Sequence, residues 1–196
     1  MRIDIAVFDG MDELDAVGPM EVLRSAEQRG AAFDVRLVSL GAATQVTCAH
    51  GLVVVPDGVS RRDADVLIFP GGGWIARAGR GVRAEVEGRR WIPLIEDAVD
   101  RKAILASVCT GAMILASAGV LAGRRATTHH GAWSDLEAAG ATLVRDRVVD
   151  DGDRITAGGV TSGIDLGLWL VERFAGPEMA RAIAENLEYR VQPSAC

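Results

Sequence analysis

The residues best suited to covalent chemistry lie around Cys109, in the run Ala103–Gly119. Cys109 follows an apolar, partly β-branched segment that favours a buried strand, and a helical pattern begins directly after it. A nucleophile on such a sharp strand-to-helix turn needs small residues two positions away on each side, and Ser107 and Gly111 meet this requirement. The pattern predicts a nucleophile elbow that carries sulfur, with helix N–H groups that favour the thiolate.

The run from Ala103 to Gly119 has two other interpretations besides a nucleophile elbow. Free cysteine is among the most buried residue types, so packing alone would also explain Cys109. The uncharged run from Ala103 to Gly123 is also long enough to cross a membrane. Its serines, threonine and glycines, its strand-then-helix pattern and its charged flanks argue against a membrane span. We therefore expect no membrane partner.

A candidate proton donor lies in the acidic stretch Asp9–Ala16, which follows the first predicted strand. A run of acidic residues is usually a solvated loop. Asp15 differs from the others because it lies between Leu14 and the apolar start of the next helix. Partial desolvation there would raise the pKa of the carboxyl and let it donate a proton near neutral pH.

Three consecutive glycines, Gly71-Gly72-Gly73, follow the predicted strand Ala64–Pro70. They could form a simple turn. They do not match a GxGxxG pattern and no P-loop lysine follows, so they do not indicate nucleotide binding. The backbone N–H groups of Gly72 and Thr110 could instead form an anion hole for charge that develops on a substrate bound to sulfur.

Histidines offer a second source of acid–base chemistry. His129 and His130 suggest a Cys–His pair, since a histidine can activate a thiol. His130 suits a solvent-exposed position equally well. His50 falls in a predicted turn with no visible partner. The residues alone leave a histidine base open.

Strands and helices alternate along the chain. This alternation predicts a largely parallel sheet with helices on both faces, and ligands bind at the carboxyl ends of such strands. The acid, the glycines and the thiol would meet at that edge. The predicted strands are Arg2–Phe8, Phe33–Leu40, Ala64–Pro70, Ile104–Val108, Arg125–His129, Thr142–Val144, Val148–Asp150 and Arg154–Ala157, with a hairpin at Gln45–Cys48 and Leu52–Pro56. The predicted helices are one opened by Gly18-Pro19 and ending near Gly30, Arg83–Arg101, one after Thr110, Ala132–Ala139, one capped by Thr161 and running through Phe174, and Pro177–Leu187.

Composition bounds the class of protein. The 196 residues are 49% hydrophobic and 24% charged, which predicts one soluble globular domain over residues 1–196. The net charge of −6 gives no basic surface for nucleic acid. Three scattered cysteines form no disulfide framework and have no zinc-ligand spacing, so we expect no metal. The first residues lead into a strand without a signal peptide, which favours a reducing cytoplasm.

Five separated motifs cover nearly the whole chain. They are LDAVGPMEVL around Asp15, Pro70-Gly71-Gly72, SVCTG around Cys109, GRRATTH ending at His129 and GGVTSGID ending at Asp165. Together they resemble the ThiJ/PfpI superfamily, the cysteine-elbow group related to class I glutamine amidotransferases. They are most similar to its isocyanide hydratase branch.

The resemblance implies a flavodoxin-like α/β sandwich that is usually a homodimer. It also implies that Cys109 is the nucleophile and that Asp15 is its carboxyl partner. The backbone amides of Gly72 and Thr110 would complete the site, the Thr110 hydroxyl is part of the branch's pattern, and His129 would be an accessory residue. No cofactor is implied, and the partner is a small-molecule substrate.

The activity implied by the branch is conversion of an isocyanide to an N-formamide through a thioimidate on Cys109. The alternatives are a glyoxalase or deglycase acting on an α-oxoaldehyde, and a redox sensor or stress protein whose cysteine oxidises. Two departures from the branch concern the substrate pocket. His130 stands where an aromatic residue such as tryptophan is expected, with Trp133 three residues on, and the chain ends at Cys196 without a longer extension.

Overall fold

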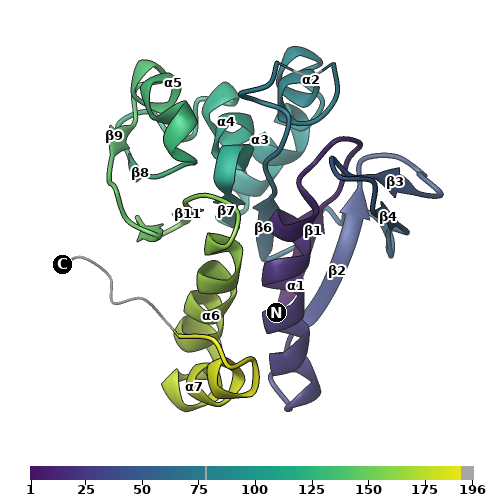
Figure 1. The fold of residues 1–196 in the computed structure, drawn as a ribbon, viewed down its shortest axis with the longest axis vertical. Coiled ribbons are helices and arrows are strands. Elements are labelled where there is room, and N and C mark those ends of the chain that lie inside the picture. The colour runs from purple at the N-terminus through teal and green to yellow at the C-terminus, as the bar shows by residue number, and fades with distance from the viewer. Residues whose placement is uncertain (78, 191–196) are drawn as a thin grey trace.

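A seven-stranded sheet forms the centre of the computed structural model, which describes residues 1–77 and 79–190; Cys196 and the end of the chain lie outside these (Figure 1). The strand order is β10-β11-β7-β6-β1-β2-β5, and every pairing is parallel except that of β10 with β11. The strands are β1 (Arg2–Ala6), β2 (Asp34–Ser39), β5 (Gly58–Val59), β6 (Val66–Phe69), β7 (Ile104–Val108), β10 (Val148–Asp150) and β11 (Arg154–Ala157).

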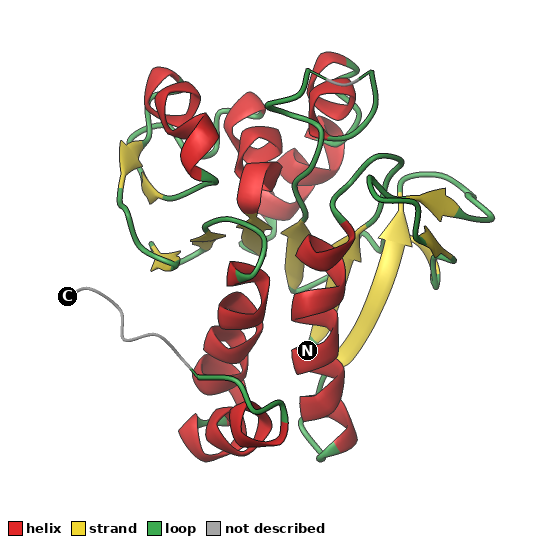
Figure 2. Ribbon diagram, in the orientation of Figure 1, coloured by secondary structure: helices red, strands yellow, loops and turns green. Residues whose placement is uncertain are grey.

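Helices cover both faces of this sheet, as the alternation of elements predicts (Figure 2). One side carries α1 (Glu13–Gln28), α6 (Ser162–Ala175) and α7 (Pro177–Asn186). The other side carries α2 (Val82–Glu87), α3 (Ile92–Asp100), α4 (Ala112–Ser117) and α5 (Trp133–Ala138). Two small sheets stand apart from the large one: the predicted hairpin β3 (Val46–Thr47) with β4 (Val53–Val54), and β8 (Arg125–Ala126) with β9 (Thr142–Leu143).

The α1–α6 pair packs closely because α6 presents glycines to α1. A Cβ atom on Gly167 would lie 2.8 Å from the Cβ atom of Val22, and a Cβ on Gly163 would lie 2.9 Å from Cδ of Pro19. Both distances are shorter than real Cβ contacts allow. The glycines therefore let the backbones of the two helices approach at the level of Pro19 and Val22.

The start of α1 differs from the prediction, which placed Asp15 in a loop and Pro19 in a first turn. Asp12 caps the helix, since its Oδ1 accepts a hydrogen bond of 3.1 Å from the N–H of Leu14. Asp15 is thus in the first turn of α1, and Pro19 lies inside the helix. Proline has no N–H to donate to the carbonyl of Asp15, so an interior position is unfavourable, and sequence pattern favours a start beside it.

The single helix predicted over Arg83–Arg101 is also wrong. The chain forms α2 and α3 with a break between Glu87 and Ile92. Arg89 adopts a φ of 51° in this break, and Pro93 lies in the first turn of α3, where a proline is tolerated. The apolar periodicity runs on because both short helices bury one face in the same core.

The strand predicted over Arg125–His129 is shorter than expected. Only β8 is extended, and it pairs with β9 outside the main sheet. The next residues turn towards β7 and β11: the Thr127 N–H donates to Thr156 Oγ1 (2.8 Å), and Thr128 Oγ1 donates to the Cys109 carbonyl (2.8 Å). These hydrogen bonds satisfy the Thr127 N–H and the Thr128 hydroxyl, so these two residues need no pairing within a strand.

Thr161 holds the N-cap position of α6, but its side chain makes no capping hydrogen bond. Its Oγ1 accepts instead from Arg147 Nη2 at 3.1 Å. The predicted capping role is therefore wrong, although the predicted helix is present.

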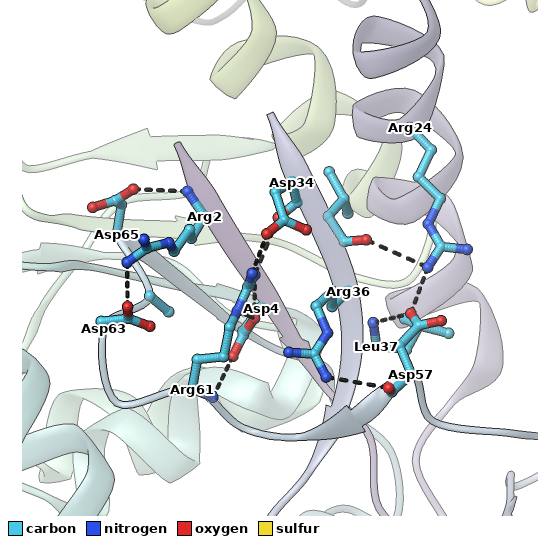
Figure 3. Close-up of polar contacts among 12 residues, drawn as sticks. Arg2, Asp4, Arg24, Asp34, Arg36, Leu37, Asp57, Arg61, Asp63 and Asp65 are labelled. Atoms are coloured by element: carbon cyan, nitrogen blue, oxygen red, sulfur yellow. Dashed lines mark hydrogen bonds and ion pairs between the residues drawn. The ribbon is translucent and has the colours of Figure 1, made fainter. Parts of the chain in front are cut away.

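A buried ion pair holds the turn after β5 against β1 (Figure 3). Asp4 of β1 is fully buried, and its two oxygens accept from the Arg61 Nε and the Arg61 backbone N–H, each at 2.8 Å. Arg61 also pairs with Asp34 of β2. A buried carboxylate without its partner is strongly destabilising, so Arg61 holds this edge together. Among the described helices, none is long and apolar enough to span a membrane.

Candidate active site

Cys109 lies on a strained turn between β7 and the 3₁₀ turn Cys109–Gly111 that leads into α4. Its φ is 55°, a value that is uncommon for a residue with a side chain. A Cβ on Gly111 would lie 2.0 Å from the Phe69 carbonyl oxygen, so only glycine fits there. The Cys109 N–H donates to the Gly158 carbonyl at 2.7 Å, which helps to hold the strained conformation. The predicted elbow geometry is confirmed.

Asp15 lies beside the elbow and is fully buried. Its Oδ2 accepts from the Gly71 N–H at 2.8 Å, and the neighbouring Cys109 side chain favours the charged form of the carboxyl. Burial raises the pKa of Asp15 well above its ordinary value, and the charge of nearby Asp12 adds to the rise. This shift favours the neutral, protonated form of the Asp15 carboxyl. Its Oδ1 is buried and has no hydrogen-bond partner among the described residues.

The sulfur itself is largely enclosed, with Cys109 only 5% exposed. Burial and the nearby Asp15 raise the pKa of the thiol to about 12, although the backbone N–H groups of Val160 and Thr110 hydrogen-bond with the sulfur and favour its charged form. The prediction that the helix start would favour the thiolate is wrong, because the loss of solvent outweighs these amides. Both pKa shifts favour the protonated forms of Cys109 and Asp15.

The two amides predicted to form an anion hole both lie at the elbow. The Gly72 N–H donates to Thr110 Oγ1 at 3.0 Å, and the Thr110 N–H hydrogen-bonds with the sulfur. Gly71 allows this convergence, because a Cβ there would lie 2.6 Å from the Thr110 nitrogen and 2.8 Å from Asp15 Oδ2. The anion hole stays a prediction, since a substrate atom would have to replace Thr110 Oγ1 as the acceptor for Gly72.

His129 lies near the elbow but is engaged elsewhere. Its Nδ1 accepts from the Gly131 N–H at 3.1 Å, and its ring centre lies 4.2 Å from that of His130. Burial and His130 lower the pKa of His129, so the ring is neutral at pH 7. In the part of the chain that the structure describes, no hydrogen bond joins His129 to Cys109. Its accessory role stays a prediction.

His130, which departs from the isocyanide hydratase pattern, lies next to Trp133. The rings of His130 and Trp133 meet edge to face with centres 6.3 Å apart. Trp133 Nε1 donates to the Thr128 carbonyl at 3.1 Å, and Thr128 Oγ1 in turn bonds to the Cys109 carbonyl. Trp133 is therefore tied to the elbow through one intervening residue.

Sequence reasoning missed the role of Val160. Its N–H hydrogen-bonds with the Cys109 sulfur, and its φ of 25° is an outlier for a β-branched residue. The only sequence feature that marks Val160 is its place in the GGVTSGID motif. Every residue except proline has a backbone N–H, so the residue type does not identify a backbone donor.

His50 has a partner, which the sequence did not predict. Its Nδ1 lies 2.9 Å from Glu13 Oε2, and its backbone N–H donates to the same oxygen at 3.2 Å. The pair raises the pKa of His50 and lowers that of Glu13. Ligand atoms of Asp12, Glu13 and His50 lie within 4.8 Å of one another. Helix capping by Asp12 and the Glu13–His50 pair account for this cluster, so we assign it no metal.

Comparisons with known proteins give a consistent picture. A model described as the DJ-1/PfpI family matches residues 1–173. The isonitrile hydratase of Pseudomonas putida (isonitrile is another name for isocyanide) is 34% identical over 98% of this chain and 80% of its own. The Parkinson disease protein 7 homolog of Danio rerio is 29% identical over 95% of this chain and 96% of its own.

A solved structure of a ThiJ/PfpI family protein from Pseudomonas syringae superposes with a TM-score of 0.84. It is 31% identical and covers 98% of this chain and 76% of its own. A DJ-1 superfamily protein from Salmonella typhimurium, at 21% identity and a TM-score of 0.82, shares the fold over 97% of this chain and 99% of its own.

Proposed function

Because the chain belongs to the DJ-1/PfpI family, we propose that it is a cofactor-independent hydro-lyase that converts isocyanides to N-formamides. One observation carries the proposal: the fully buried Asp15 lies beside Cys109, and its raised pKa favours the protonated form of its carboxyl. The family includes relatives with quite different names, so membership alone does not choose the reaction. Similarity to an isonitrile hydratase supports this choice.

The shape of the substrate suits an enclosed sulfur. An isocyanide, R–N≡C, is linear at its reactive end, and its terminal carbon is the atom that a nucleophile attacks. Such a narrow end can reach the sulfur of Cys109, a residue that is only 5% exposed, more readily than a branched carbonyl group can. Sulfur is also a soft nucleophile that matches this carbon, and a covalent intermediate divides the hydration into two easier steps.

In the first step, the Cys109 sulfur forms a bond to the terminal carbon. The thiol proton passes to one oxygen of Asp15 while the proton of the other oxygen passes to the carbon. Asp15 stays neutral throughout, and the product is a thioimidate, R–N=CH–S–Cys109. Asp15 Oδ1 is buried and has no hydrogen-bond partner among the described residues, whereas Oδ2 accepts from Gly71; this difference supports Oδ1 as the donor.

In the second step, water adds across the C=N bond, with its oxygen on carbon and a proton on nitrogen. The carbon–sulfur bond then breaks, the hydroxyl proton returns to sulfur, and R–NH–CHO leaves. The Thr110 hydroxyl accepts from Gly72 and keeps its own proton to orient this water. We assign Thr110 this orienting role, with the backbone amides of Gly72 and Thr110 as donors to charge on the adduct.

The wild-type protein tests the reaction directly. We expect it to convert phenyl isocyanide to N-phenylformamide, measured by chromatography, well above the rate with heat-denatured protein. Methylglyoxal under the same conditions tests the glyoxalase or deglycase alternative. Turnover of methylglyoxal without turnover of any isocyanide would contradict the proposal and select that alternative.

A redox-sensor function is less well supported by the site. Oxidation favours exposed thiols of low pKa, whereas the Cys109 thiol is enclosed and has a pKa of about 12. We propose that the protein acts in the cytoplasm, where free thiols such as those of Cys48 and Cys109 stay reduced.

We also propose that the protein acts as a homodimer. Glu13 and His50 join the first turn of α1 to the β3–β4 hairpin. Exposed aliphatic residues gather on these two elements: Leu14, Leu52, Val53 and Val55. Analytical ultracentrifugation should give twice the 20.7 kDa of one chain. The double variant Leu52→Asp/Val55→Asp should shift the sample towards single chains, and a wild type that stays monomeric at every concentration would contradict the proposal.

A further inference from the structure

Three loops converge around the enclosed sulfur. The loop after β6 reaches the elbow through the hydrogen bond from Gly72 to Thr110 Oγ1. The loop after β8 reaches it through Thr128 Oγ1, which donates to the Cys109 carbonyl. The loop after β11 reaches it through the Val160 N–H, which bonds to the sulfur. Residues of these three loops therefore border Cys109.

Ile75 bridges two of the loops. It follows the glycines after β6, and 54% of its surface is exposed. Its Cδ1 lies 2.6 Å from the position that a Cβ on Gly131 would take, and His129 Nδ1 lies 3.3 Å from the same position. Ile75 therefore packs directly on the backbone of the loop after β8, beside the ring of His129.

The contacts continue from there to the third loop. His129 Cδ2 lies 2.9 Å from the position of a Cβ on Gly159, the residue before Val160. Ile75, Gly131, His129 and Gly159 thus form a continuous series from an exposed side chain to the neighbour of the sulfur's own hydrogen-bond donor. Gly131 and Gly159 have no side chains at these contacts, so Ile75 and the His129 ring are the side chains of this series.

We propose that Ile75 limits the width of the substrate group that can reach Cys109, and so acts as a specificity-determining residue. The inference rests on the proposed role of Cys109 as the nucleophile and goes beyond it. A slender substituent passes the Ile75 side chain, whereas one branched next to the reactive atom contacts it. The enzyme then selects isocyanides with a narrow group on nitrogen over those with a branched group.

Alkylation of Cys109 tests this limit without relying on turnover. Iodoacetamide and 2-iodo-N-phenylacetamide carry the same reactive group and differ in width. Peptide mass spectrometry measures their rates at Cys109 separately from the other cysteines. Ile75→Ala should raise the ratio of the wide-probe rate to the narrow-probe rate by about tenfold or more, and Ile75→Trp should lower it. Val59→Ala, which trims another exposed aliphatic residue, is the matched control and should leave the ratio unchanged.

The same variants are then compared on methyl and tert-butyl isocyanide. Ile75→Ala should raise the relative kcat/KM for the branched substrate. An unchanged alkylation ratio in both Ile75 variants overturns the inference, whatever the isocyanide rates are. A changed ratio in a protein that hydrates no isocyanide leaves the width limit standing and removes the proposed function instead. Thermal melting confirms that the variants are folded, as expected for changes at an exposed position.

Discussion

Cys109→Ala is expected to reduce the formation of N-formamide to the rate measured without protein. The sulfur forms the covalent bond of the thioimidate, and no other described side chain at the site offers a soft nucleophile. Chromatography of the formamide over time measures the loss. Mass spectrometry of rapidly quenched wild type should show a mass increase equal to one isocyanide on the peptide that contains Cys109, and no increase in the variant.

Cys48→Ala is the matched control for this result. Cys48 is a second buried thiol, and burial together with neighbouring carboxylates raises its pKa to about 11. The mechanism uses no atom of Cys48, so the variant should keep wild-type turnover once its folded fraction is accounted for by thermal melting. Equal formamide formation by wild type and Cys109→Ala would rule out the covalent route.

Asp15→Asn should lower kcat/KM by about 10²–10⁴-fold, the range typical of losing a positioned general acid. Asparagine can still accept the hydrogen bond from Gly71, so the first turn of α1 keeps its place while the transferable proton is lost. Glu21→Gln, which alters an exposed carboxyl on the same helix, should leave the rate unchanged. Steady-state kinetics on phenyl isocyanide compare the variants, and a full rate in Asp15→Asn would remove Asp15 from the proton transfer.

Asp15→Asn, which should lower activity, should raise the free energy of unfolding. The pKa of Asp15 is raised in the folded state from 3.8, its ordinary value, so above about pH 4 the folded protein holds a proton that the unfolded chain releases. The proton on Asp15 therefore stabilises the folded wild type at about pH 4. This stabilisation is lost as pH rises from about 4 through the pKa of Asp15 in the folded state. Asparagine does not ionise, so its gain in unfolding free energy over wild type should be smallest near pH 4 and grow towards neutral pH. Urea unfolding at several pH values measures the difference.

The sequence supports the sheet and the elbow because both depend on local patterns. Apolar strands alternate with helices, and small residues flank Cys109 at the spacing that the turn requires. The start of α1 was misplaced because Pro19 is favourable at a helix start, whereas the packing of α6 accepts it inside the helix. The break before Ile92 was missed because one buried face continues across both helices.

The electrostatics of the site depended on information that residue types do not carry. A helix start after Cys109 favours a thiolate only if the sulfur remains solvated, and the degree of burial follows from three distant loops. The raised pKa of Asp15 was foreseeable, since its apolar neighbours in the sequence already suggest desolvation. The Val160 donor and the partner of His50 are contacts between segments far apart in the chain, and only the folded structure reveals them.

The close α1–α6 contact supports one side of the site. Asp15 stands in the first turn of α1, and Val160 lies just before α6, so the acid and the amide beside the sulfur are carried by one closely packed helix pair. The Ile75 and His129 loops belong to no such pair. Substitutions in these loops are therefore expected to alter access to Cys109 while Asp15 and the Val160 amide keep their positions at the sulfur.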